Sequence, residues 1–412
     1  MSEHITTPSG LRILIDPVPH VETVAMGVWF GVGTRDEVHA AQNGIAHLVE
    51  HMLFKGTATR SALDIVREVE SHGAQINAYT GREMTAYTIY ALKDDLRMGL
   101  TILADMIRNS LFAEHDLKLE QDVIVQEIGM VADTPDDIIH DDAFETAFPK
   151  QAFGRPVLGR EEVIRALKPE DLKAYSASHY HAGCGVVSIA GNVDVEQVRV
   201  MVEEIFGGWE KRELIERDKA DYKGGIHKAD RKLEQTHIIY GMESLARGDA
   251  RHTALGLYIE ALGGGMASRL FQEVREKRGL AYAVYASNQT YADTGFLNIY
   301  AGTDPAKAQD CLNVIRDELA AGVMHISADD LQRAKTQRKA GLLMAQESMM
   351  ARADRAARQV LLHGRLVPIS ETITRIENVT RGEVGTLCEE LATRPFLCAL
   401  RGPKVDKLSV AA

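Results

Sequence analysis

The sequence has few cysteines, no long apolar run and no basic start, and each absence excludes a class of protein. No window approaches about 18 uncharged apolar residues, so we expect no membrane-spanning helix. Residues Met1–Thr7 have neither the basic region nor the apolar core of a signal peptide, which predicts a cytoplasmic protein. The cysteines show no C-x-x-C spacing, so we expect buried free thiols in a reducing compartment: Cys184, Cys311, Cys388 and Cys398.

An excess of basic residues is also absent. The formal net charge of −12 argues against nucleic acid as a partner, because the phosphate backbone attracts cationic surfaces. An apolar fraction of 45% with 26% charged residues is typical of a soluble globular protein. At 412 residues the chain exceeds one ordinary hydrophobic core, so we expect two domains of about 200 residues each.

The two halves of the chain share one pattern of elements. Each contains an alternating strand, a turn, a second alternating strand that ends in Tyr-Ala, and an amphipathic helix. The Tyr-Ala pairs begin at Tyr90 and Tyr300, which are 210 positions apart. Each half also has a late strand that ends in glycine, at Gly191 and Gly402, which are 211 positions apart. The matching order indicates a duplicated unit.

A charged, glycine-rich stretch separates the halves, as expected of a linker: Gly207–Glu213 and Asp221–Gly225. We therefore predict an α+β fold of two homologous domains, residues 1–215 and 225–412. Each domain is expected to be a mostly antiparallel sheet packed with helices.

The run from His47 to His51 has the spacing H-x-x-E-H, with Glu50 as its carboxylate. Because a helix advances about 100° per residue, His51 lies about 40° around from His47, and Glu50 about 60° to the other side. Two imidazoles on one face can bind one Zn²⁺, and the carboxylate can deprotonate a water beside it. This order is the inverzincin signature. A helix whose His and Glu merely face solvent is the alternative, and a metal site needs a third ligand.

Two glutamates on a second predicted helix are candidates for the third ligand. The segment Asp116–Met130 has apolar residues at helical spacing, and Glu120 and Glu127 share one of its faces to within about 20°. Glu127 has apolar neighbours in sequence, and a carboxylate in such surroundings favours a metal or a cation as its partner. Two exposed glutamates on an amphipathic helix are the alternative. Their joint occurrence with H-x-x-E-H favours the metal site.

Together these motifs resemble the pitrilysin/insulinase family of zinc metallopeptidases, in particular its two-domain branch with mitochondrial processing peptidase and its bacterial relatives. That family carries H-x-x-E-H followed by a glutamate some 75 residues later, and here 75 residues separate His51 from Glu127. The resemblance implies that His47, His51 and Glu127 bind one Zn²⁺ per chain. It also implies that Glu50 is the general base and that Glu120 orients a ligand. The flanking segments match as well: Phe30–Arg35 and Phe54–Thr57.

The second half carries a glycine-rich stretch, Gly263–Gly265, followed by Arg275 and Tyr282, which are seven positions apart. In the family, an arginine and a tyrosine at this spacing reach the active site from the second half. The resemblance therefore implies that Arg275 and Tyr282 hold the peptide carbonyl and stabilise the oxyanion. Taken alone, the arginine is typical of a surface ion pair and the tyrosine of a half-buried strand.

Two further pairs are implied to bind the substrate. The strand Ile76–Thr80 resembles the family's substrate-pairing edge, so Asn77 and Ala78 are expected to bind an extended peptide through main-chain hydrogen bonds. Asp137 and Asp141 stand at the offsets past the third ligand where processing peptidases bind an arginine near the cleavage point. The first of that pair is typically Glu, so the shorter Asp137 departs from the pattern. A solvated acidic helix face is the alternative.

The resemblance implies a zinc endopeptidase that hydrolyses short or unfolded peptides, including presequence-like ones with a basic residue near the cleavage site. In the eukaryotic processing enzyme the zinc site and the glycine-rich loop belong to different subunits, whereas this chain retains both. That departure predicts a homodimer, in which each zinc site faces the Arg275 and Tyr282 of the other copy in a closed chamber. Two alternatives stay open, a non-catalytic scaffold or peptide-binding subunit of the same family and a dedicated peptide-maturation enzyme.

Overall fold

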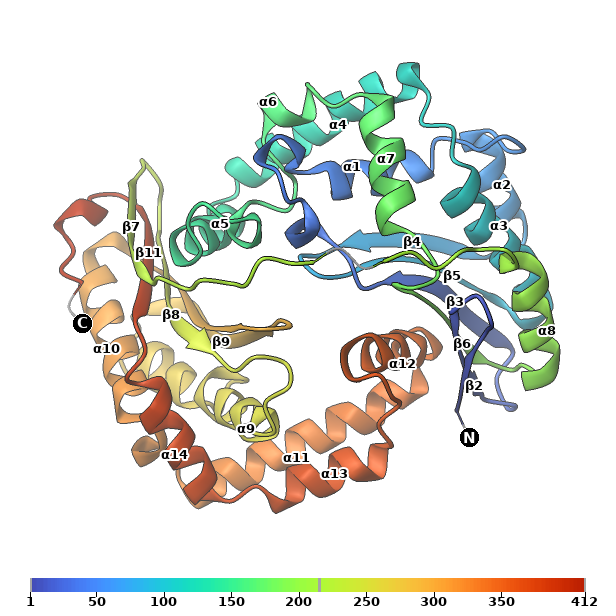
Figure 1. The fold of residues 1–412 in the computed structure, drawn as a ribbon. Helices are drawn as coiled ribbons and strands as arrows, with labels where there is room; N and C mark the ends of the chain where they lie inside the picture. Colours follow the sequence, from blue (N-terminus) through green and yellow to red (C-terminus); the bar gives the residue numbers. More distant parts are fainter. Residues whose placement is uncertain (1, 214–215, 411–412) are drawn as a thin grey trace. The chain divides into compact units, whose positions relative to one another are not determined.

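Two sheets organise the chain, and each is the centre of one compact unit (Figure 1). The computed structural model describes residues 2–213 and 216–410. No helix in these described residues is long and apolar enough to cross a membrane. Each unit draws on three stretches of the sequence, which are Met1–Gly129, Arg155–Asp218 and Met344–Leu366 for unit 1 and Met130–Gly154, Lys219–Leu343 and Val367–Ala412 for unit 2.

The sheet of unit 1 has six strands in the order β1-β2-β6-β3-β5-β4. Every neighbouring pair is antiparallel except β2 and β6, which run parallel. Strand β4 ends the sheet and pairs only with β5 among the described strands. The strands are β1 (Glu3–Thr6), β2 (Arg12–Pro17), β3 (Thr23–Phe30), β4 (Gln75–Thr80), β5 (Thr85–Leu92) and β6 (Gly185–Gly191).

Both faces of this sheet are buried, because its central strands carry apolar side chains on both sides. Successive side chains of a strand point to opposite faces. In β3, Met26 and Val28 therefore pack in the main core of the unit, while Ala25 and Trp29 lie in a separate cluster. The helices that surround the sheet are α1 (Ile45–Leu53), α2 (Ala62–Ser71), α3 (Leu96–Asn109), α4 (Glu114–Ala132), α6 (Glu161–Ile164), α7 (Pro169–His179), α8 (Val195–Phe206) and α12 (Met349–His363).

Helix α12 comes from the second half of the sequence but packs on the sheet of unit 1, beside β2, β3 and β6 (Figure 1). Its buried residues Met349, Ala353 and Val360 belong to the same cluster as Trp29. The indole Nε1 of Trp29 donates a hydrogen bond to Asp354 Oδ1 at 3.0 Å. Without α12 this face of the sheet would present apolar side chains to water.

The sheet of unit 2 has five strands in the order β7-β11-β8-β10-β9, and only β7 and β11 are parallel. The strands are β7 (Gly225–Asp230), β8 (Thr236–Ser244), β9 (Ala281–Thr290), β10 (Gly295–Thr303) and β11 (Phe396–Gly402). The unit also contains a π-helix, Phe271–Glu276, and the helices α5 (Pro135–Ala147), α9 (His252–Gly263), α10 (Ala308–Ala321), α11 (Ala328–Met344), α13 (Ile369–Asn378) and α14 (Arg381–Leu391).

Helix α5 comes from the first half of the sequence but packs on the sheet of unit 2. Its residues Ile139 and Phe144 share a buried cluster with Phe296 of β10 and Leu397 of β11. An ion pair between Asp142 and Arg401, 2.6 Å long and largely buried, also joins α5 to β11. Each sheet is therefore covered on one face by a helix from the other half of the chain.

The predicted duplication and fold class are confirmed. The order β7-β11-β8-β10-β9 repeats β2-β6-β3-β5-β4, including the single parallel pair, and β1 is an addition to the first sheet. The compact units differ from the predicted halves at α5 and α12, each of which packs on the other half's sheet. The sequence could not predict this exchange, because local patterns do not show which distant sheet a helix will cover. The domain ranges 1–215 and 225–412 stay a prediction, and residue 215 lies outside the described residues.

The cysteines lie in the cores, as predicted. Cys184 packs in the core of unit 1, and Cys311, Cys388 and Cys398 pack in the core of unit 2. All four are buried free thiols. Burial raises the pKa of the Cys184 thiol to about 11, so it stays protonated and unreactive near neutral pH.

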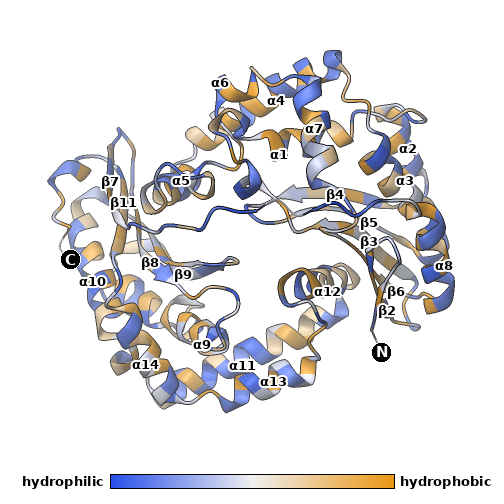
Figure 2. Cartoon of the chain, viewed as in Figure 1, coloured by the Kyte–Doolittle hydropathy of each residue, from blue (hydrophilic) through white to orange (hydrophobic). Residues whose placement is uncertain are grey.

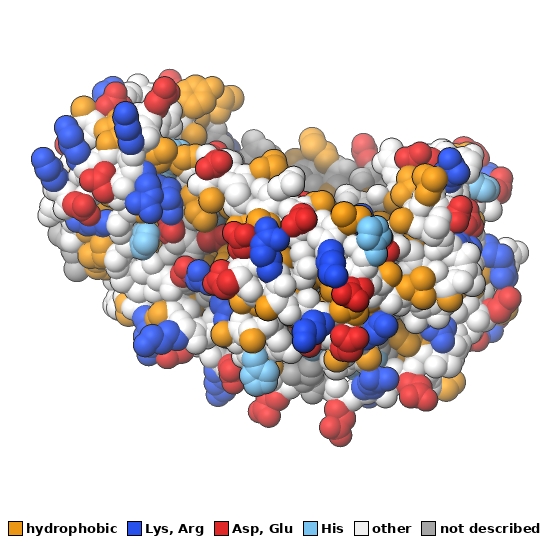
Figure 3. All heavy atoms as spheres, turned by 90° about the horizontal axis from the view of Figure 1, so that it is seen from above, with side chains coloured by type: hydrophobic (Ala, Val, Ile, Leu, Met, Phe, Trp, Pro, Cys, Tyr) orange, Lys and Arg blue, Asp and Glu red, His pale blue; other side chains and the backbone are white. Residues whose placement is uncertain are grey.

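Surface charges of both signs alternate on the face that Figure 3 shows. Ion pairs also link exposed charges of opposite sign, such as Lys118 and Glu114 at 2.8 Å and Asp122 and Arg165 at 2.9 Å. The net charge of −12 is therefore not gathered into one acidic patch on this face.

Gly44, which precedes α1, is a backbone position that only glycine fills without strain. Its φ is +92°, and a Cβ atom there would lie 2.6 Å from Ile164 Cδ1 and 2.7 Å from Gly159 Cα. We expect Gly44→Ala to lower the free energy of unfolding by about 1–3 kcal/mol, measured by urea denaturation. The matched control is Gly129→Ala in α4, where a Cβ meets no atom within 4 Å and stability should be unchanged or rise by up to about 1 kcal/mol. Equal stability of the two variants would contradict this account.

Candidate metal centre

Helix α1 presents three polar side chains because the rest of it is buried. Six of its nine residues pack in the core, and the three that do not are His47, Glu50 and His51. Their spacing of three and four places them on one face. Figure 2 shows the hydrophobic character of the rest of the helix. The predicted helix and its polar face are therefore present, and the direction of that face is set by apolar packing.

A buried carboxyl group holds the start of α1. Glu37 is fully buried and accepts hydrogen bonds from the backbone N–H groups of Gly44 at 3.0 Å and Ala46 at 3.1 Å. The side-chain amide of Asn43 donates a third hydrogen bond at 3.2 Å. The first N–H groups of a helix have no partner within the helix, so Glu37 supplies one from outside.

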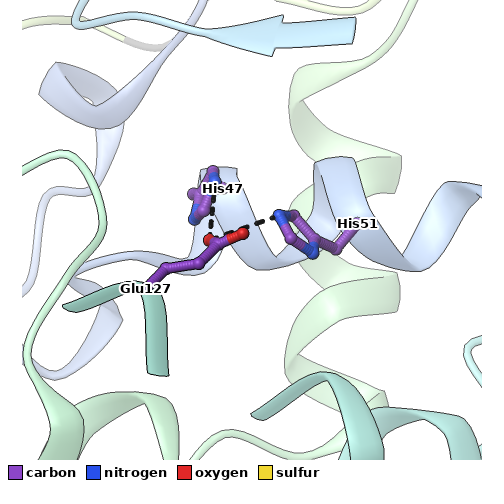
Figure 4. A group of neighbouring side chains, drawn as sticks. All are labelled: His47, His51 and Glu127. Atoms are coloured by element: carbon purple, nitrogen blue, oxygen red, sulfur yellow. Dashed lines mark ion pairs between the residues drawn. The ribbon is translucent and has the colours of Figure 1, made fainter. Parts of the chain in front are cut away.

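Glu127 of α4 brings its carboxylate to the two imidazoles (Figure 4). Its Oε2 lies 3.9 Å from His47 Nε2 and 3.7 Å from His51 Nε2. Among residues 2–213 and 216–410, these three side chains are the one group of His, Cys, Asp or Glu whose ligand atoms all lie within 4.8 Å of one another. The separations are too long for hydrogen bonds. They are close to the spacing of about 3.4 Å between two ligand atoms on one tetrahedral Zn²⁺.

Glu120, about two helical turns before Glu127 on α4, contacts His51 and Lys55. Its Oε2 lies 2.9 Å from His51 Nδ1, and its Oε1 lies 2.6 Å from Lys55 Nζ. Burial would raise the pKa of Glu120, but the hydrogen bonds from His51 and Lys55 outweigh it and hold the pKa below its usual value. The ionised carboxylate can only accept, so the His51 proton sits on Nδ1. The lone pair on Nε2 is then directed toward Glu127.

The two histidines have different protonation tendencies. Burial, reinforced by the neighbouring His51, lowers the pKa of His47 to about 4, so this imidazole is neutral near pH 7 and its lone pair can bind a metal. Burial also acts to lower the pKa of His51, but Glu120, Glu127 and Glu50 together outweigh it and raise that pKa. A bound cation would reverse this tendency, because it repels the second proton.

Glu50 lies on the same face but points to the neighbouring strand. Its Oε2 accepts a hydrogen bond from the Thr80 hydroxyl at the end of β4. Burial raises the pKa of Glu50, and the charge of Glu127 adds to the effect, while Thr80 and His51 oppose it. A carboxylate with a raised pKa accepts a proton near neutral pH more readily than an exposed glutamate does.

An open pocket of about 250 Å³ lies between α1 and the edge strand β4. Its lining includes both predicted substrate-binding residues, Asn77 and Ala78. The pocket is therefore bordered by the polar face of α1 on one side and on the other by β4, the last strand of the sheet in the described residues. Its full lining is Glu50, His51, Phe54, Lys55, Ile76, Asn77, Ala78 and Glu120.

The remaining predicted site residues belong to unit 2. Arg275, on the π-helix, donates a hydrogen bond from Nη1 to the carbonyl oxygen of Tyr282 at 3.0 Å, and its guanidinium carbon lies 5.0 Å from the Tyr282 ring centroid. Tyr282 is the second residue of β9 and is 77% exposed. Asp137 is exposed and Asp141 is half-buried, and both lie on α5. The structure thus pairs Arg275 with Tyr282 within unit 2, and the roles predicted for these four residues stay predictions.

Three residues beside the centre were not among the predicted site residues: Glu37, Lys55 and Thr80. Lys55 lies in the flanking segment Phe54–Thr57 and Thr80 ends the predicted edge strand, so both stood next to recognised motifs. Lys55 contacts Glu120, 65 positions away, and Thr80 contacts Glu50, 30 positions away. No local pattern of residues reveals such contacts.

Two family models match the chain. Residues 12–161 match the model described as Insulinase (Peptidase family M16), and residues 166–338 match the model described as Peptidase M16 inactive domain. The chain is 38% identical to an uncharacterized zinc protease of Streptomyces coelicolor, over 98% of this chain and 90% of that protein. It is 35% identical to the uncharacterized zinc protease YmxG of Bacillus subtilis, over 98% of each chain. The chain belongs to the insulinase family, peptidase family M16.

Solved structures share the fold. A protease from Helicobacter pylori superimposes with a TM-score of 0.90 at 20% sequence identity, over 98% of this chain and 99% of that one. A Pseudomonas fluorescens protein described as a peptidase M16 inactive domain also gives a TM-score of 0.90, at 19% identity and over 98% of each chain. At such identities the likeness concerns the fold alone, and it agrees with two duplicated units.

The Glu120–His51 hydrogen bond gives a test of the metal centre. Glu120→Gln keeps the shape of the side chain but removes its charge, so we expect zinc affinity to fall about 10–100-fold in a competition titration with a chromophoric chelator. Glu114→Gln is the matched control, because Glu114 lies on the exposed face of the same helix and pairs with Lys118. Equal zinc affinity of the two variants would show that Glu120 does not support a metal ligand.

Proposed function

We propose that this protein is a zinc-dependent endopeptidase that hydrolyses short or unfolded peptides. The observation that carries the proposal is the convergence of two imidazole nitrogens and one carboxylate oxygen from His47, His51 and Glu127, with the carboxylate of Glu50 beside them. Two nitrogens and one carboxylate oxygen are a donor set of catalytic zinc sites, which keep a fourth position open. The zinc protease names of the relatives support the same reading.

The residues present fit a zinc ion. Neutral His47 has one ring nitrogen with a free lone pair, and the hydrogen bond from His51 Nδ1 to Glu120 leaves Nε2 of His51 to face Glu127. When bound, Zn²⁺ would polarise the scissile carbonyl and lower the pKa of a water molecule in the open position. Glu127 supplies the negative charge that balances part of the ion's charge.

Glu50 would transfer the proton. Its carboxylate accepts a proton from the attacking water and then delivers it to the nitrogen of the departing amine. Burial raises the pKa of Glu50, which makes the carboxylate a stronger base than an exposed glutamate. The base is neutralised as pH falls, so activity would be lost on the acid side of neutrality.

The edge strand β4 would bind the substrate. Its outer edge pairs with no other described strand, and Asn77 and Ala78 line the pocket beside Glu50. An extended peptide added to this edge would form main-chain hydrogen bonds, which tolerate varied sequences. Short and unfolded peptides can adopt that conformation, whereas most segments of a folded protein are held in their own secondary structure.

For presequence-like substrates, Asp137 and Asp141 would bind an arginine near the cleaved bond. They stand four positions apart on α5, so they lie on one side of the helix. Two carboxylates offer an arginine fork a charged, bidentate partner. Equal kcat/KM for peptides with and without an arginine two residues before the cleaved bond would remove this part of the proposal.

The first test replaces the base. We expect Glu50→Gln to lower kcat about 10²–10⁴-fold on fluorogenic peptides, with bound zinc unchanged, because the amide cannot accept the proton. Chelation should abolish wild-type activity and added zinc should restore it. Glu70→Gln, at an exposed position of α2, is the control and should keep wild-type activity.

If the Glu50→Gln protein stayed active after its metal was removed by a chelator and zinc was added back, the mechanism would be contradicted. A fully zinc-loaded wild-type protein that binds peptides but cleaves none would instead favour a peptide-binding or scaffold subunit.

The second test concerns the assembly. We propose a homodimer in which Arg275 and Tyr282 of one copy complete the zinc centre of the other. Glu50→Gln and Arg275→Ala proteins should each be inactive, and mixing them should restore up to about a quarter of wild-type activity, because random exchange pairs an intact zinc centre with an intact Arg275 in some dimers. Mixtures that stay inactive despite subunit exchange, shown by fluorescence energy transfer between labelled copies, would contradict the shared site.

A further inference from the structure

We propose that Thr80 is a positioning residue for Glu50, and that its hydroxyl holds the carboxylate of the base in its working orientation. The Thr80 hydroxyl donates a hydrogen bond to Glu50 Oε2. This inference rests on the proposed function, because it assigns Thr80 a role through the base of that reaction. Within the described part of the chain, the Thr80 hydroxyl forms no hydrogen bond with His47, His51 or Glu127.

The turn after β4 fixes Thr80 from one side. Thr80 pairs with Thr85 at the end of the β4–β5 hairpin, and Gly81 N–H donates to the Met84 carbonyl at 2.7 Å to close the turn. Thr80 is β-branched, so its χ1 angle has few accessible rotamers on this strand. The hydroxyl therefore has a defined direction once the backbone is set.

Hydrogen bonds also join the β4–β5 turn to the loop that precedes α1. Thr34 N–H donates to the Gly81 carbonyl at 3.1 Å, and Arg35 N–H donates to the Arg82 carbonyl at 2.8 Å. The approach is so close that a Cβ atom on Gly33 would lie 2.1 Å from the Gly81 oxygen. Loop and turn thus behave as one continuous piece of hydrogen-bonded backbone.

The loop of residues 33–37 also anchors the helix that carries Glu50. Glu37, two residues after Arg35, binds the first N–H groups of α1, the helix that carries Glu50. Both ends of the Thr80–Glu50 hydrogen bond are therefore anchored to residues 33–37. Such a closed arrangement keeps the distance between the strand end and the helix constant.

The opposite face of β4 is anchored as well. The neighbouring residue Tyr79 points away from Thr80, and its hydroxyl donates to Asp354 Oδ1 at 2.9 Å and accepts from Arg358 Nη2 at 2.7 Å. Both partners lie on α12. These contacts oppose rotation of the strand about its own axis, which would move the Thr80 hydroxyl away from Glu50.

The hydrogen bond matters because a glutamate side chain has three rotatable bonds and a carboxylate that turns freely in water. The hydrogen bond from Thr80 to Oε2 of Glu50 restricts the rotation of the carboxylate. The other oxygen, Oε1, is not bonded to Thr80. A displacement of about 1 Å at a catalytic group can cost about 100-fold in rate. The loss would appear in kcat, since the Thr80 hydroxyl acts through Glu50, whereas the peptide would bind to main-chain groups of β4.

Thr80→Val, which keeps the shape and removes the hydroxyl, should lower kcat about 10–100-fold, with KM within about twofold of wild type and zinc content unchanged. Thr80→Ser keeps the hydroxyl and should retain kcat within about threefold. In a Glu50→Gln background, Thr80→Val should cause no further loss, because the base through which it acts is gone. Thr101→Val is the matched control, since among the described residues its hydroxyl bonds only to the Arg97 carbonyl on α3, and it should leave kcat unchanged.

The outcomes separate this inference from the proposed function. A wild-type enzyme that needs both zinc and Glu50, with a Thr80→Val variant of normal kcat, would overturn the role of Thr80 and leave the function standing. A change in KM alone would also overturn it. If Thr80→Val fails to fold or bind zinc, Thr80→Ala and Thr80→Ser decide, and equal kcat for these two refutes the role. A zinc-loaded wild type without peptidase activity would overturn the function and this inference together.

Discussion

The burial of α1 in the core of unit 1 is the constraint on which the candidate site depends. Six of nine residues are inside, and burying an aliphatic side chain such as Leu48 or Val49 stabilises the fold by about 1.5–3 kcal/mol. Turning the helix about its axis would expose several of them at once. The directions of His47, Glu50 and His51 are therefore set by hydrophobic packing before any metal binds, and a preorganised donor set loses little free energy to reorganisation when the ion arrives.

Around this helix, buried polar groups are satisfied by partners that also orient the centre. Glu37 binds the first N–H groups of α1, and Glu120 lies between Lys55 and the Nδ1 atom of His51. Leaving any of these groups unpaired in the interior would cost about 1–3 kcal/mol or more. The same hydrogen bonds that prevent this cost fix the start of the helix, the tautomer of His51 and the charge of Glu120. Stability and the organisation of the site thus rest on shared contacts.

The exchange of α5 and α12 between the two halves has a consequence for both sheets. Each half of the chain, taken alone, would lack the helix that covers one face of its sheet, and the exposed apolar surface would favour aggregation. Each half therefore supplies a helix to the buried core of the other half's sheet. The exchange also reaches the candidate site, because Asp354 and Arg358 of α12 hold Tyr79 of the edge strand β4. The second half of the sequence contributes in this way to the geometry of the first.

Short-range patterns in the sequence were enough to predict the local features of the candidate site. The spacing of His47, Glu50 and His51 defines a helix face, and the 210-residue repeat between Tyr90 and Tyr300 predicted two similar sheets, which the strand orders confirm. Glu127 was selected by family resemblance, since its own helix only made it one of two candidates. The three-dimensional packing was needed to show that Glu120 binds His51, that Thr80 binds Glu50, and that α5 and α12 pack on the other half's sheet. These contacts join residues far apart in the chain, and they depend on how whole surfaces pack, which no local pattern of residues records.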